Sequence, residues 1–182
     1  LSELDGNKRI SSAIMVAAIR KKLGISTSEA EEILEKYYWN KLTNEELKLI
    51  LKALESFDAE TAEKEARKVM EEKILTAIKE KGEEWVIAAM VDGSAGYHTP
   101  AHAKNIIERF LAGHREDWCE RCFCLYQGDL TKMMYYDITG FERIERNNPE
   151  KVARIVEYVR QVIKLDSIRQ IELGLMYPTM GL

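Results

Sequence analysis

Apolar residues recur along most of the chain at intervals of three and four, a spacing that places them on one face of an α-helix. The clearest example runs from Asp58 to Lys81, where Glu, Lys and Arg fill the intervening positions. Its apolar residues are Ala62, Ala66, Val69, Met70, Ile74, Ala77 and Ile78. This pattern predicts a long helix with one buried face and one solvated face.

Local signals mark where such helices begin and end. Ser26–Glu29 and Thr43–Glu46 have the sequence of capping boxes, and Thr99 precedes a proline at the first helical position. Gly24, Gly82 and other glycines follow helical segments and predict their ends. We therefore expect helices at about 7–23, 26–37, 43–54, 58–81, 85–91, 99–112, 116–127 and 130–136, and a last one from 149 onward.

Two interruptions are predicted in the C-terminal part. Thr139–Gly140 has the composition of a turn. After the apolar face of the last helix, the spacing slips to successive threes at Leu165, Ile168 and Ile171. Because a straight helix would rotate these residues away from the core, we expect a kink or break near Asp166.

These elements predict an all-α fold, an irregular or orthogonal bundle of about seven to nine helices. Apolar residues make up 46% of the 182-residue chain and charged residues 32%, which is sufficient for a core and for solubility. The loop Asp92–Gly96 suggests an N-terminal half, 1–92, and a C-terminal half, 97–182. Whether the two halves form a single domain stays open.

Composition also narrows the functional class and the compartment. The net charge of −4 argues against a nucleic-acid coat protein, and the interleaved Glu, Lys and Arg residues resemble a thermophile composition. The apolar runs Ala13–Ile19 and Trp85–Val91 are too short to cross a bilayer. Three cysteines, an odd number within one short stretch, do not suggest a secreted disulfide framework. We expect a cytoplasmic protein that does not insert into membranes.

The three histidines and three cysteines all lie between His98 and Cys124. Four of them, His114, Cys119, Cys122 and Cys124, are residue types that bind structural zinc. The interpretation that we favour places Cys119 and Cys122 on a buried helical face, where a free thiol behaves as a small apolar group. A redox role is the third possibility. Zinc is therefore a possible cofactor.

His98 and His102 are a second, weaker candidate pair for a metal. They are four residues apart, but Pro100 lies between them at the start of a helix. His98 is therefore expected outside that helix, so the pair does not form the rigid clamp of a helical metalloprotease. We favour two histidines at a helix start with polar partners.

Arg109 and His114 are separated by four residues within a predicted all-helical protein. In this feature the segment resembles the ribonuclease motif of HEPN domains. The resemblance implies that these two side chains would act as the catalytic pair of a hydrolase. Phe110 stands where that family usually has a polar residue, and Gly113 interrupts the helix that would present His114.

Ile19–Leu34 looks like a helix-turn-helix, with Gly24 at the turn and a basic corner formed by Arg20, Lys21 and Lys22. The second helix of this pair carries several glutamates, which phosphates would repel. A helical hairpin that packs within the protein is therefore the better interpretation.

Aromatic and apolar clusters point to association. Two clusters each span more of a helix than one core can cover: Tyr37–Trp39 and Met133–Tyr136. The tail from Leu173 to Leu182 is also apolar. We predict a homodimer or another protein partner. The leading function is a non-catalytic interaction or regulatory protein, followed by a nucleic-acid-associated protein and by a metal-dependent or HEPN-like hydrolase.

Overall fold

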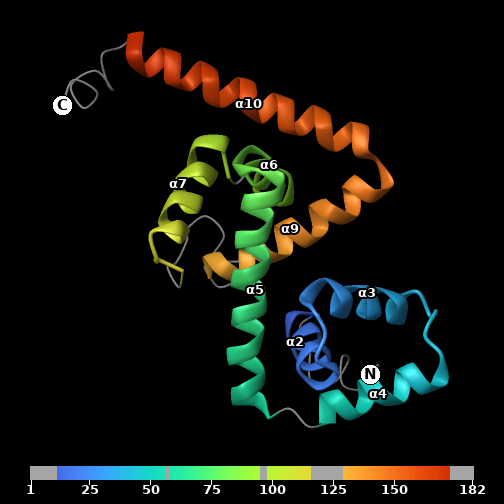
Figure 1. The fold of residues 1–182 in the computed structure, drawn as a ribbon. Helices are drawn as coiled ribbons and strands as arrows, with labels where there is room; N and C mark the ends of the chain where they lie inside the picture. Colours follow the sequence, from blue (N-terminus) through green and yellow to red (C-terminus); the bar gives the residue numbers. More distant parts are fainter. Residues whose placement is uncertain (1–11, 56–57, 95–97, 116–128, 173–182) are drawn as a thin grey trace. The chain divides into compact units, whose positions relative to one another are not determined.

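A computed structural model describes residues 12–55, 58–94, 98–115 and 129–172 (Figure 1). Within these ranges the chain forms eight α-helices and no β-strand, so the all-α prediction is confirmed. The helices are α2 (Ser12–Leu23), α3 (Thr27–Tyr38), α4 (Asn44–Glu55), α5 (Ala59–Lys81), α6 (Glu83–Gly93), α7 (Pro100–Leu111), α9 (Leu130–Asn147) and α10 (Pro149–Glu172). None of these helices combines the length and apolarity that a membrane crossing requires.

The predicted helix starts are confirmed by side-chain hydrogen bonds. The Ser26 hydroxyl accepts from the Glu29 amide at 3.2 Å, and the Glu29 carboxylate accepts from the Ser26 amide at 3.4 Å. Thr43 and Glu46 form the same reciprocal pair at the start of α4. The Thr99 hydroxyl accepts from the His102 amide at 3.2 Å. Each bond satisfies an amide that has no partner within its own helix.

The helices gather into two compact units, Leu1–Lys73 and Ile74–Leu182, called unit 1 and unit 2 below. The boundary between them falls inside α5, since Lys73 and Ile74 are consecutive residues of that helix. The sequence-based division at Asp92–Gly96 lies elsewhere and stays a prediction.

Unit 1 is built around α2, which packs against α3 and α4. Most side chains from Ala13 to Ile19 are buried, so α2 has neighbours on several sides. The facing residues are Ala30 and Leu34 of α3 together with Ile50, Ala53 and Leu54 of α4. The alanines among these residues allow the helices to approach closely.

Unit 2 is built around α6, which packs against α7, α9 and α10. All six side chains from Trp85 to Met90 are buried, which explains why this run shows no polar face in the sequence. The Trp85 ring meets Phe141 of α9 edge-on at 5.1 Å, and its indole N–H donates to Glu145 at 2.9 Å. The helix predicted at 85–91 is confirmed.

Both predicted interruptions are wrong. α9 continues through Thr139 and Gly140, and the Thr139 hydroxyl donates to the Tyr136 carbonyl at 3.1 Å within the helix. One glycine weakens a helix by roughly 1 kcal/mol, less than the burial of Ile138 and Phe141 contributes. α10 likewise continues through Asp166, and its apolar residues beyond that point are therefore exposed.

The sequence predicts that Met133–Tyr136 spans more of its helix than one core can cover. This prediction is wrong for most of these residues. Met133, Met134 and Tyr135 are buried, and Tyr136 is half-buried. They are covered because α9 packs against α6, α7 and α10, so more than one face of the helix is buried. The other cluster behaves as expected, since Tyr38 is 53% exposed and Trp39 is 67% exposed.

Candidate functional site

A group of buried polar side chains lies at the C-terminal end of α6. Ser94, His98 and Asp137 are among the few buried polar residues of the described chain. The Ser94 hydroxyl donates to the Val91 carbonyl at 3.2 Å and accepts from the His98 amide at 3.0 Å. Ser94 thereby ties the end of α6 to His98, which lies two residues before α7.

The structure brings the two candidate histidines, His98 and His102, together. Their rings stack with centroids 5.1 Å apart and planes 4° from parallel; His98 is buried and His102 half-buried. Stacked rings hold their nitrogens in two parallel planes, so the stack itself does not aim both at one ion. No group of three or more His, Cys, Asp or Glu side chains suited to a metal occurs among the described residues.

Asp137 of α9 is the residue of this cluster that sequence reasoning missed. Its side chain is buried at 5% exposure, and its Oδ2 atom has no hydrogen-bond partner. Burial, followed by the nearby charge of Asp92, raises the pKa of Asp137 to about 8. The carboxyl group is therefore mainly protonated at neutral pH.

Gly93 makes room for this carboxyl group. A Cβ atom at position 93 would overlap Asp137 Oδ1, closer than unbonded carbon and oxygen atoms approach each other. One signal in the sequence could have revealed the site: Asp137 occupies a position between Met133, Met134 and Phe141 on the apolar face of its helix.

The Arg109–His114 pair sits at the end of α7. The helix ends at Leu111, Gly113 has φ of 102°, and the His114 amide donates to the Arg109 carbonyl at 2.9 Å. Both side chains are exposed, and His114 lies beyond the helix that carries Arg109. The HEPN-like hydrolase stays a prediction.

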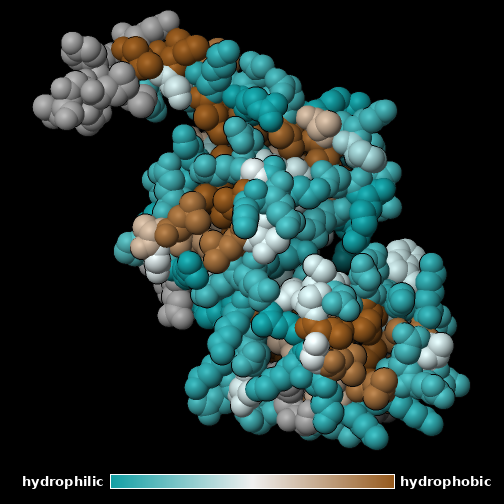
Figure 2. Space-filling model, in the orientation of Figure 1, coloured by the Kyte–Doolittle hydropathy of each residue, from teal (hydrophilic) through white to brown (hydrophobic). Residues whose placement is uncertain are grey.

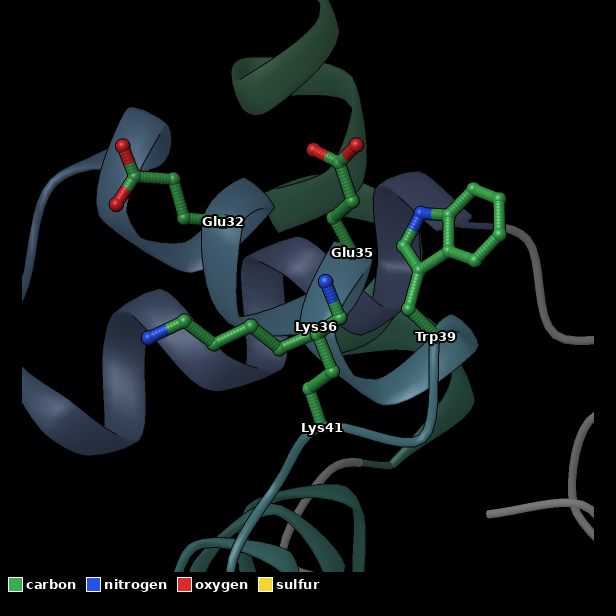
Figure 3. A pocket seen from close by; sticks show the side chains of 5 residues that line it. All are labelled: Glu32, Glu35, Lys36, Trp39 and Lys41. Atoms are coloured by element: carbon green, nitrogen blue, oxygen red, sulfur yellow. The ribbon is translucent and has the colours of Figure 1, made fainter.

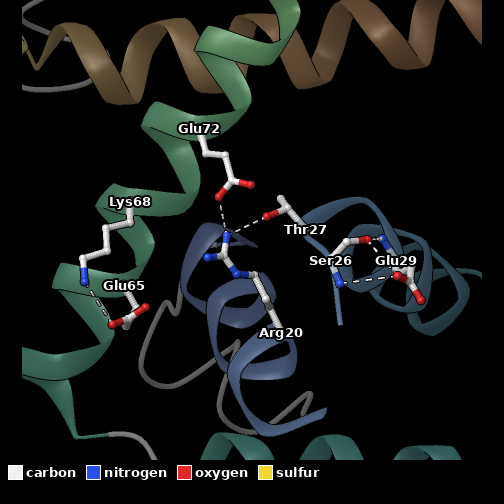
Figure 4. A network of polar contacts seen from close by, with 7 residues as sticks. All are labelled: Arg20, Ser26, Thr27, Glu29, Glu65, Lys68 and Glu72. Carbon is white, nitrogen blue, oxygen red and sulfur yellow. Dashed lines mark hydrogen bonds and ion pairs between the residues drawn. The ribbon is translucent and has the colours of Figure 1, made fainter. Parts of the chain in front are cut away.

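Acidic neighbours offset part of the charge of the basic corner (Figure 4). One guanidinium nitrogen of Arg20 lies 2.5 Å from the Glu72 carboxylate and donates to the Thr27 hydroxyl at 2.8 Å. Lys21 lies 3.9 Å from Glu65, and Lys22 is exposed. Nucleic-acid binding by this corner stays a prediction, as does zinc binding, because Cys119, Cys122 and Cys124 lie outside the described residues.

No protein family, curated protein or solved structure was found to match this chain.

The largest exposed apolar feature on a single described helix is on α10. Tyr158 and Leu165 are each 62% exposed, Ile171 is 47% exposed and Ile168 is 43% exposed. Figure 1 shows the C-terminal end of α10 extending beyond α6, α7 and α9, and Figure 2 shows apolar surface along that end. We call Tyr158, Leu165 and Ile168, with Gln161 between them, the outer stripe.

Proposed function

We propose that the protein is a non-catalytic helical interaction protein that pairs with a second copy of itself through the outer stripe of α10. The observation that supports this proposal is the exposure of three large apolar side chains on one face of that helix. Exposed apolar residues that gather in this way mark interaction surfaces in soluble proteins.

The outer stripe and the packed face of α10 are distinct. Val152 and Val159, which are 2% and 0% exposed, face the rest of unit 2. At about 100° per residue, the centre of the outer stripe lies roughly 140° around the helix from those valines. The described helices of unit 2 therefore leave the stripe uncovered.

The stripe has the spacing of a coiled-coil seam. Tyr158, Gln161, Leu165 and Ile168 follow one another at intervals of three, four and three, as a and d positions do. Antiparallel pairing across a two-fold axis places Tyr158 opposite Ile168 of the other copy, and Gln161 opposite Leu165. The same four residues of each copy then form the interface, so no other protein is needed as a partner.

The expected dimer is weak. The stripe covers about 15 Å of helix at roughly 1.5 Å per residue, so the buried area lies at the low end for specific interfaces. We expect association in the micromolar range, with monomers and dimers in exchange.

Sedimentation between about 1 and 100 µM tests the proposal. We expect the wild type to shift towards twice the chain mass as concentration rises, and Leu165→Glu with Ile168→Glu to remain monomeric. Leu49→Glu is the matched control, because Leu49 is 49% exposed but belongs to unit 1. A wild type that stays monomeric throughout would overturn the dimer.

Deletion of residues 173–182 tests whether the outer stripe is covered by a second copy or by the C-terminal tail of the same chain. If the full chain is monomeric and the shortened chain dimerises through Leu165, the apolar tail occupies the stripe and the pairing proposal is wrong. If both forms dimerise equally, the tail is not involved and the proposal stands.

A further inference from the structure

We draw no further inference here: the strongest candidate, the surface hollow of about 500 Å³ at the end of α3 that is lined by Glu32, Glu35, Lys36, Trp39 and Lys41 (Figure 3), carries nothing because its two glutamates and two lysines give it no net charge that would select a ligand.

Discussion

Burial keeps the Asp137 carboxyl group neutral at physiological pH, and this makes the stability of the fold depend on pH. The folded pKa is about 8, above the ordinary value of 3.8, so folding favours the protonated form. The contribution of the protonated carboxyl group to the free energy of unfolding is fully present below pH 3.8, the ordinary pKa of an aspartate. It declines as pH rises towards the folded pKa and is absent above about pH 8.

Asp137→Asn should remove this part of the pH dependence, because an amide cannot ionise. Between pH 5 and pH 9 we expect the wild type to lose about 4 kcal/mol more of its free energy of unfolding than the variant loses. Urea unfolding at the two pH values measures the difference. Asp92→Asn should reduce the loss only partly, since the charge of Asp92 is the smaller cause of the shift. Parallel pH profiles for wild type and Asp137→Asn would show that the carboxyl group does not titrate as described.

Gly93→Ala should destabilise the protein by roughly 2–3 kcal/mol, since the new Cβ would clash with Asp137 Oδ1 and force α6 and α9 to shift. Thermal unfolding measures the change. Asp137→Gly in the same chain removes the clashing atoms, and the effect of Gly93→Ala should then be smaller. An undiminished effect would place its cause outside this contact.

At the scale of the element, the sequence predicted helix starts well because a cap depends on residues only three positions apart. The bonds of Ser26 with Glu29 and of Thr43 with Glu46 are local, so no tertiary information was needed. The continuity of α9 and α10 could not be predicted in the same way. It depends on the neighbours of Ile138 and Phe141, which come from distant parts of the chain.

The candidate site shows the same limit. The sequence identifies His98 and His102 as candidates because histidine binds metals. The stacking of their rings could not be predicted, because it depends on how α7 begins. Asp137 differs, because a lone acid on an apolar helical face is visible in the sequence. Its contact with Gly93 requires that α6 and α9 pack together, which no local pattern reveals.

Gly140 offers a prediction for α9 as a whole. It lies within the helix, its φ is not positive, and a Cβ atom there would meet nothing within 4 Å. Gly140→Ala should therefore raise the free energy of unfolding by about 0.5–1 kcal/mol, through the better helix propensity of alanine. Denaturant unfolding provides the measurement. A loss of stability would instead indicate that α9 needs a bend at this residue.

At the scale of the whole molecule, the proposed self-association predicts that stability depends on protein concentration. A dimer that dissociates on unfolding makes Tm rise with protein concentration, by about 2 °C for each tenfold increase at this chain length. Scanning calorimetry across two decades of concentration should show the rise for the wild type. Leu165→Glu should abolish the rise without changing the Tm of the dilute protein, because Leu165 is 62% exposed in the single chain. A dilute variant that melts earlier would mean that Leu165 supports the monomer as well.

The contact between Gly93 and Asp137 also has a consequence for divergence among related sequences. Any side chain at position 93 competes for the volume that the carboxyl group of residue 137 fills. A lineage that gained alanine or serine at position 93 would be under selection to acquire a smaller residue at position 137, and the reverse order of change would be tolerated more easily. The two positions should therefore covary, with replacement at position 137 preceding replacement at position 93.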